Sequence, residues 1–231
     1  MKLIALGDTH GRDIWKRIIF KEQDFDKIIF IGDYFDTKED ISGNQQIENF
    51  KNILDTKIKY PDKFVLLIGN HDFHYLKTTE ESYSGFQNDY SKSISRLLHR
   101  AIEKNLLQMC FVSGDYLFVH AGVTKTWCQI NKIDENNLEN AINKLFIDNP
   151  NAFAFTEGKK GSLTGDEICQ TPIWVRPRSL AEDKIDNFFQ IVGHTQVRRI
   201  TFTDDFVLID VLGYTEEYLI VKDGKKTVGR L

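Results

Sequence analysis

The chain has 231 residues, of which 41% are hydrophobic and 28% are charged, and its formal net charge is −4 at pH 7. This length supports one sizeable core, so we expect a single catalytic domain over 1–231. The composition gives no electrostatic reason to expect a nucleic-acid partner or an anionic membrane surface, and no apolar run approaches the roughly 20 residues of a membrane span.

The amino-terminal part of the chain alternates between predicted strands and predicted helices. Short apolar runs predict strands at 2–6, 27–31 and 63–68, and apolar residues at helical spacing predict helices at 12–20 and 44–58. This βαβαβ order indicates helices packed on a largely parallel sheet, with right-handed crossovers.

The remainder of the chain is first mixed and then all-β. Segments 73–90 and 149–180 carry loop signals, and we interpret them as excursions over the active face. The other predicted elements are a helix at 91–106, a hairpin of strands at 108–112 and 116–120, a helix at 134–147, and strands at 188–192, 198–203, 206–210 and 216–221.

The first apolar run and the cysteines both favour a cytoplasmic protein. The run at 3–6 is too short for the hydrophobic region of a signal peptide, which needs about 7–15 residues. The three cysteines are scattered and lack the spacing of a zinc site or a disulfide framework: Cys110, Cys128 and Cys169. We therefore expect reduced thiols without a catalytic role.

Five short polar motifs stand where predicted buried strands end. They are Gly7-Asp8-Thr9-His10-Gly11, Gly32-Asp33-Tyr34-Phe35-Asp36, Gly69-Asn70-His71-Asp72, His120-Ala121-Gly122 and Gly193-His194-Thr195. Functional groups are often carried by the loops that leave such strands. Five loops rich in oxygen and imidazole groups therefore predict one shared metal site.

The residue types in these motifs suit a transition-metal site that binds phosphate. Asp8 and His10 point to one side if the backbone is extended, and Asp33 could bridge two ions. The remaining candidate ligands are Asn70, His120 and His194. This mixed set suits Mn, Fe, Zn or Co better than Ca or Mg, which favour oxygen ligands alone. Two ions about 3.5–4 Å apart would clamp a phosphate and generate hydroxide near neutral pH.

Further residues beside these motifs are candidates for proton transfer and phosphate recognition. His71 could protonate a leaving alkoxide, and the carboxylate of Asp72 could orient its ring. Arg176 is the leading candidate for bidentate phosphate binding, with Arg178 as the alternative. A lone histidine is more often structural than functional, so we interpret His74 and His99 as structural residues.

The five ordered motifs resemble those of the calcineurin-like metallophosphoesterases, over residues 7–195 and with comparable spacing. Within that family they are similar to the phosphoprotein-phosphatase branch, which includes bacterial Ser/Thr phosphatases and symmetrical diadenosine-tetraphosphate hydrolases. The segment Trp174-Val175-Arg176 is similar to a Trp-x-Arg stretch of that branch. The resemblance implies an α/β fold, a four-layer α/β/β/α sandwich with two central mixed sheets flanked by helices.

The resemblance also implies a dinuclear centre, with manganese first and iron, zinc, cobalt or nickel as alternatives. One ion would be held by Asp8, His10 and Asp33. The other would be held by Asp33, Asn70, His120 and His194. His71 becomes the acid and Asp72 its orienting partner, Asp36 belongs to the catalytic set, and Asn70 also contacts the substrate phosphate.

Two departures from the family pattern bear on the substrate. Many branch members carry Arg after the second Asp of the second motif, whereas here Asp36 is followed by Thr37 and Lys38, so Lys38 is the substitute phosphate ligand. Many phosphodiesterases end on Gly-His-x-His, whereas Gln196 stands here in place of the last histidine. This difference favours monoesters over diesters.

Three functions remain open from the sequence. The leading hypothesis is a metal-dependent phosphatase in which a metal-bridging hydroxide attacks a phosphomonoester, of a small molecule, nucleotide or Ser/Thr phosphoprotein. The alternative is a dinucleoside-polyphosphate or other nucleotide hydrolase, whose base slot could be built by Tyr34, Phe35, Phe73 and Tyr75. A non-enzymatic metal-binding scaffold is disfavoured because it has no need of a leaving-group acid such as His71.

Overall fold

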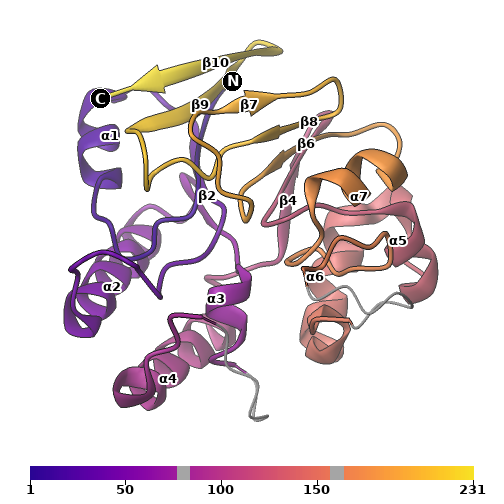
Figure 1. The fold of residues 1–231 in the computed structure, drawn as a ribbon. Helices are drawn as coiled ribbons and strands as arrows, with labels where there is room; N and C mark the ends of the chain where they lie inside the picture. The colour runs from indigo at the N-terminus through magenta and orange to yellow at the C-terminus, as the bar shows by residue number, and fades with distance from the viewer. Residues whose placement is uncertain (77–83, 157–163) are drawn as a thin grey trace.

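Two five-stranded mixed sheets form the centre of the computed structural model, which describes residues 1–76, 84–156 and 164–231 (Figure 1). The first sheet has the order β10-β9-β1-β2-β3. Its strands are β1 (Lys2–Leu6), β2 (Lys27–Phe30), β3 (Phe64–Leu66), β9 (Glu217–Lys222) and β10 (Lys225–Arg230). The three amino-terminal strands run parallel to one another, while β9 is antiparallel to both β1 and β10.

The second sheet also contains three parallel strands. Its order is β4-β5-β6-β8-β7, with β5, β6 and β8 parallel and the two outer strands antiparallel to their neighbours. The strands are β4 (Cys110–Ser113), β5 (Tyr116–Val119), β6 (Phe189–Val192), β7 (Thr201–Phe202) and β8 (Phe206–Leu208).

Alternating side chains of these strands build two separate apolar layers. Leu3 and Ala5 of β1 share one buried cluster with Phe118 of β5 and Ile191 of β6, so this cluster lies between the sheets. Ile4 belongs to the other cluster, which contains the buried faces of the helices. The central strands are therefore buried on both faces, which explains why their sequences are continuous apolar runs.

Helices cover the outer faces of both sheets (Figure 1). On the side of the first sheet, Trp15 of α1 meets Phe30 of β2 with ring centroids 6.0 Å apart. On the other side, α6 contacts β4. The α-helices are α1 (Trp15–Lys21), α2 (Gly43–Lys59), α3 (Asn70–Phe73), α4 (Ser91–Glu103), α5 (Lys125–Asn131), α6 (Leu138–Asp148) and α7 (Pro177–Asp183), and the 3₁₀ turns are Asn88–Tyr90, Glu135–Asn137 and Pro150–Phe153. Within the described ranges, none of the helices has the length and apolar character needed to cross a bilayer.

The fold confirms the predicted α/β architecture with two mixed sheets and flanking helices. The predicted strands and the longer helices all occur, with ends shifted by a few residues; the helix expected at 12–20 begins only at Trp15. Four helices and strands were not predicted: α3, α5, α7 and β10. The three helices have four to seven residues, too few to show a helical period, and β10 is a largely polar edge strand.

The side chain of Asn49 on α2 holds the loop after β1 in place. Its Oδ1 atom accepts a hydrogen bond from Trp15 Nε1 at 2.9 Å, and its Nδ2 atom donates to the carbonyls of Gly11 at 3.2 Å and Arg12 at 3.0 Å. Asn49 is buried, so all three partners would lose their bond without access to water. Asn49 therefore connects a helix to the loop that carries His10.

Asn49→Ala should lower the free energy of unfolding by about 2–3 kcal/mol, because it leaves one buried donor and two carbonyls unsatisfied. Urea unfolding followed by circular dichroism measures this loss. Asn52→Ala is the matched control, since Asn52 lies one turn later on α2 and its side chain makes no hydrogen bond to a described residue. Equal effects of the two substitutions would contradict an anchoring role for Asn49.

Candidate metal centre

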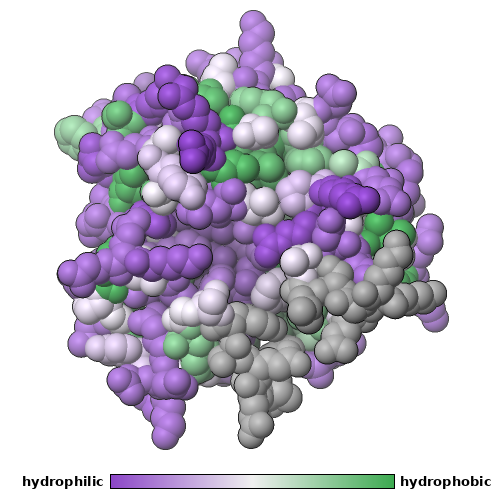
Figure 2. Space-filling model, viewed as in Figure 1, coloured by the Kyte–Doolittle hydropathy of each residue, from purple (hydrophilic) through white to green (hydrophobic). Residues whose placement is uncertain are grey.

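The loops that follow the parallel strands of both sheets meet at a cavity of about 610 Å³. Five of the six predicted ligands line it: Asp8, His10, Asp33, Asn70 and His194. The sixth, His120, is fully buried directly behind them and contacts Asn70 and Asp33. In the view of Figure 2, hydrophilic residues fill the recessed centre of this face. The structure thus brings the predicted ligand set together from five separate loops.

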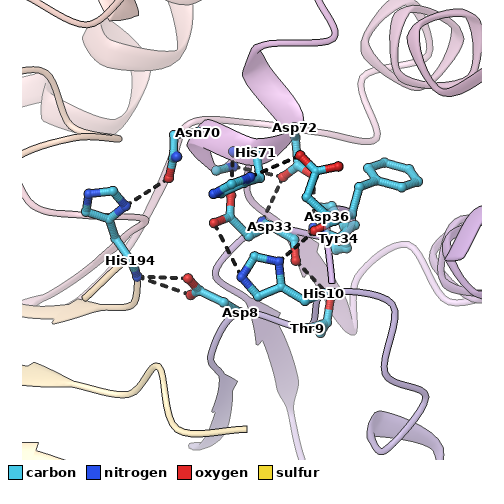
Figure 3. A network of polar contacts seen from close by, with 12 residues as sticks. Asp8, Thr9, His10, Asp33, Tyr34, Asp36, Asn70, His71, Asp72 and His194 are labelled. Carbon is cyan, nitrogen blue, oxygen red and sulfur yellow. Dashed lines mark hydrogen bonds and ion pairs between the residues drawn. The ribbon is translucent and has the colours of Figure 1, made fainter. Parts of the chain in front are cut away.

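Asp33 lies between the two histidines that come from different sheets. Its Oδ2 atom is 3.9 Å from His10 Nε2 and 3.5 Å from His120 Nε2. Its Oδ1 atom accepts a hydrogen bond from the backbone N–H of His71 at 2.8 Å, which leaves Oδ2 directed at the two rings. Figure 3 shows the contact with His10. This is the placement expected of a carboxylate that bridges two cations.

The tautomers of His10 and His120 are set by backbone carbonyls. His10 Nδ1 lies 2.6 Å from the carbonyl of Phe35, and His120 Nδ1 lies 2.9 Å from the carbonyl of Ile31. A carbonyl can only accept, so both Nδ1 atoms carry the proton and each neutral ring presents an Nε2 lone pair to Asp33. Lone pairs facing a carboxylate repel it unless a cation lies between them, so the geometry fits metal ligation.

Asn70 and His194 complete the second half of the cluster. Asn70 Oδ1 lies 2.9 Å from His120 Nε2 and 2.8 Å from His194 Nδ1. The backbone N–H of His194 donates to Asp8 Oδ2 at 3.0 Å, which connects the loops after β1 and β6 (Figure 3). The Nε2 atom of His194 is buried and has no hydrogen-bond partner among the described residues.

The backbone is locally adapted to hold these side chains close together. A Cβ atom on Gly69 would lie 2.1 Å from Asp33 Oδ1, and one on Gly193 would lie 2.1 Å from Asp8 Oδ1, so both positions require glycine. Four site residues have a positive φ that L-residues seldom adopt: His10, Asp33, Asp36 and His194. Strained conformations of this kind cluster at functional sites.

The ionisation of the ligands favours cation binding. Burial, together with neighbouring carboxylates, raises the pKa of Asp8 and Asp33 well above the usual value of 3.8. Burial lowers the pKa of His10 to about 4 and that of His120 to about 3, so both rings are neutral at physiological pH. One ligand atom each from Asp8, Asp33 and His120 lie within 4.8 Å of one another. The residues therefore fit divalent metal ions, although they do not identify the metal.

The carboxylate beside His71 is Asp36 and not Asp72. Asp36 Oδ2 lies 3.0 Å from His71 Nδ1, and its Oδ1 atom accepts a hydrogen bond from the Tyr75 hydroxyl. His74 Nε2 lies 2.6 Å from the same Oδ2 atom and is fully buried, so the structural interpretation of that histidine overlooked its contact with the site. Burial would raise the pKa of Asp36, but these hydrogen bonds outweigh it and lower the pKa to about 2.

The expectation that Asp72 orients the His71 ring is corrected by its contacts. Asp72 Oδ2 accepts hydrogen bonds from the backbone N–H groups of Asp33 at 2.8 Å and Gly69 at 2.9 Å, and Oδ1 accepts from Tyr34 at 2.8 Å. The carboxylate therefore ties the second motif to the third. The prediction paired His71 with Asp72 because the two are adjacent in the sequence. It was wrong because Asn70, His71 and Asp72 lie in one short helical turn and point in different directions.

Cationic side chains line the same cavity. Arg176 is held by a hydrogen bond from Nε to the carbonyl of Thr164 at 2.8 Å and from Nη1 to Thr195 Oγ1 at 3.3 Å. Lys38 also lines the cavity, whereas Arg178 is exposed and does not. The sequence interpretation missed Arg12, which lines the cavity and is paired with Glu39 at 2.7 Å.

Comparisons with known proteins agree with this arrangement. A profile of the family described as calcineurin-like phosphoesterase matches residues 1–206. A probable serine/threonine-protein phosphatase of Encephalitozoon cuniculi is 26% identical over 141 residues, covering 58% of this chain and 29% of that protein. Human serine/threonine-protein phosphatase 5 is 27% identical over 143 residues, covering 58% and 28%. The chain thus spans less than a third of the length of these relatives.

Solved structures show the same fold at low sequence identity. A cold-active protein tyrosine phosphatase superposes with a TM-score of 0.60 at 19% identity, covering 98% of this chain and 78% of that one. A serine/threonine phosphatase from Saccharomyces cerevisiae superposes with a TM-score of 0.58 at 14% identity, covering 100% and 80%.

Metal affinity should fall as the pH is lowered, because Asp8 and Asp33 must lose their protons to bind a cation and their pKa values are raised by burial. We expect Mn²⁺ to bind at least about tenfold more weakly at about pH 5.5 than at about pH 7.5. Calorimetric titration of metal-free protein at each pH measures this ratio. Equal affinities would contradict carboxylates that hold protons in the metal-free state.

Asp72→Asn should destabilise the metal-free protein by about 1–3 kcal/mol, because an amide cannot accept all three backbone hydrogen bonds. Urea unfolding measures the loss, with Asp62→Asn as a control of equal charge change at an exposed position. If Asp72→Asn had normal stability and lost only activity, the result would support the original prediction that Asp72 orients the His71 ring.

Proposed function

Since the chain belongs to the calcineurin-like phosphoesterase family, we propose that it hydrolyses phosphate monoesters at a centre of two divalent metal ions, with manganese as the first candidate. The proposed substrate is a phosphorylated small molecule, nucleotide or protein in the cytoplasm. The observation that carries this proposal is the convergence of Asp8, His10, Asn70, His120 and His194 on Asp33, with both Nε2 lone pairs facing its carboxylate.

The ligand set divides naturally into two groups around Asp33. Asp8 and His10 come from one loop, whereas Asn70 contacts both His120 and His194. Figure 3 shows Asn70 beside His194. When bound, two ions would offset the negative charge of the phosphate and supply a hydroxide nucleophile near neutral pH. The loop glycines and Asp72 keep the ligands at fixed positions, which is what a catalytic metal site requires.

His71 is the proposed proton donor to the leaving group. Its ring lines the cavity, while its Nδ1 atom is held by Asp36, so the opposite nitrogen is directed away from the carboxylate. Asp36 stays ionised because its hydrogen bonds lower its pKa to about 2, so it can accept a hydrogen bond from the ring. The contacts of Asp36 with His74 and Tyr75 fix its orientation, so the pair is preorganised.

Arg176 is the proposed phosphate-binding group. Its contacts with Thr164 and Thr195 hold the guanidinium at the cavity while leaving Nη2 without a hydrogen bond to any described residue. Lys38 adds a second, exposed cation. The planar guanidinium of Arg176 and the ammonium of Lys38 bind free phosphate oxygens. They therefore suit a phosphate monoester better than a diester, which has fewer free oxygens.

The alternative dinucleotide substrate receives less support from the structure. The four aromatic residues expected to form a base slot are all buried in the core: Tyr34, Phe35, Phe73 and Tyr75. Tyr34 packs on Phe50 with ring centroids 4.5 Å apart. Tyr214, which is 61% exposed, and Trp174, which is 8% exposed, line the cavity instead, so a base would meet one exposed aromatic side chain there.

The test compares metal-stripped protein, reloaded with Mn, Co, Zn or Mg, on an aryl phosphate monoester, its bis-aryl diester and diadenosine tetraphosphate. We expect turnover of the monoester with Mn, a loss of about 10²–10⁴-fold in kcat for His71→Gln at unchanged metal content, and loss of metal in Asn70→Ala. His99→Gln is the matched control, because His99 is exposed on α4.

Each contrary result has a distinct meaning. Faster cleavage of the dinucleotide would replace the monoester by the alternative substrate. Normal activity of His71→Gln would remove the proposed proton donor. A protein that binds metal but cleaves none of the three substrates would overturn the proposed phosphatase.

A further inference from the structure

The sequence motifs identified the loops after five parallel strands, but the two sheets contain six. The sixth is β8, which runs parallel to β6 and continues as Ile209 and Asp210. Asp210 stands two residues after the end of its strand, as Asp8 does after β1 and His194 does after β6. Topology therefore brings the Asp210 carboxylate to the same edge as the five recognised loops, and it lines the cavity.

The backbone of Asp210 is pressed against the loop that carries Asp8. A Cβ atom on Gly7 would lie 2.1 Å from the carbonyl oxygen of Ile209 and 3.0 Å from Asp210 Cα. The carbonyl of Asp210 accepts a hydrogen bond from the N–H of Val197 at 2.9 Å, which fixes the same segment to the loop after β6. The position of Asp210 beside Asp8 is thus set by its main chain and does not depend on its side chain.

The Asp210 side chain is buried without a protein partner. The residue is 5% exposed, and its carboxylate accepts no hydrogen bond and forms no ion pair with any described residue. Arg12 and Lys38 act on its charge only from a distance and form no ion pair with it; Arg12 is paired with Glu39, and Lys38 is exposed. The neighbouring Asp8 and Asp33 add negative charge of their own.

A buried carboxylate with no partner is costly, and next to another carboxylate it is more so. A structural carboxylate would have been expected to accept backbone hydrogen bonds, as Asp72 does. The cost is removed if a cation binds in the cavity between these groups. The absence of protein partners for Asp210 among the described residues therefore points to a ligand and not to a role in the fold.

We propose that Asp210 is a further member of the metal centre, which favours a divalent cation at the Asp8 end through its charge and through hydrogen bonds to water. The inference rests on the proposed dinuclear function. The Asp8 end has three predicted protein ligands, and Gln196, which also lines the cavity, replaces a fourth. Asp210 adds negative charge at this end of the site, which has one protein ligand fewer. It does so as a positioning residue and not as a direct ligand.

The test uses Asp210→Asn, which keeps the shape of the side chain and removes its charge. Asp204→Asn is the control, since Asp204 is exposed in the turn before β8 and carries the same charge. Two quantities are measured on metal-stripped protein: the melting temperature without metal, and the affinity and number of Mn²⁺ ions bound.

We expect Asp210→Asn to melt about 2–4 °C higher than wild type without metal, because an unpaired buried charge has been removed. We expect one of two Mn²⁺ ions to bind about 10–100-fold more weakly, with the other unchanged. A structural carboxylate would give the opposite sign for the melting temperature. Asp210→Ser should show the same loss of affinity, and a failure of both variants to fold would overturn the inference.

The remaining outcomes separate this inference from the proposed function. Two Mn²⁺ ions bound by Asp210→Asn with wild-type affinity would overturn the inference alone. Wild-type protein that binds two ions but cleaves no phosphoester would overturn the proposed function alone. Wild-type protein that binds no Mn²⁺ would overturn both.

Discussion

Six parallel strands, three in each sheet, end around one small space, and nearly every polar group of the site depends on that convergence. Asp33 shows the consequence most directly. Its Oδ2 atom receives the Nε2 atoms of His10 and His120 from different loops, and both rings are turned toward it by carbonyls of the main chain. The fold therefore concentrates carboxylates and lone pairs where water has little access, and either bound protons or metal cations relieve their repulsion.

The two carboxylates of the catalytic loops have separate tasks. Asp72 accepts three backbone hydrogen bonds and joins the loops after β2 and β3, so its charge is used to hold the scaffold. Asp36 instead contacts side chains that line or support the cavity, including His71 and His74. Because one carboxylate fixes the loops, the other is free to orient His71, the proposed proton donor.

Groups of opposite charge line the same cavity. The predicted ligands bring negative charge to it, while Arg176 and Lys38 bring positive charge. A phosphate has oxygens that suit both kinds of group, provided that cations cover the carboxylates. The same reasoning underlies the proposal for Asp210, whose charge acts on Asp8 and would therefore favour a cation bound there.

The sequence by itself determined the α/β class, the strand order along the chain and the residue types that end each buried strand, because these depend on apolar runs and local turn chemistry. That was sufficient to select six candidate ligands, which the structure brings together, and the candidates His71 and Arg176, which line the same cavity. It could not decide between Asp36 and Asp72 as the partner of His71. That choice depends on a positive φ at Asp36 and a single helical turn at 70–73, neither of which has a periodic pattern.

Only the tertiary structure showed that Asp210 and His74 belong with the site and that the predicted aromatic slot is part of the core. Asp210 follows an apolar run as Asp8 does, but the run alone does not reveal that β8 is parallel to β6. The direction of a strand is set by its hydrogen-bonded neighbours, which are distant in sequence. The residue types at the strand ends could therefore be predicted from the sequence. The place where these residues meet could not, because it depends on how the strands pair in the two sheets.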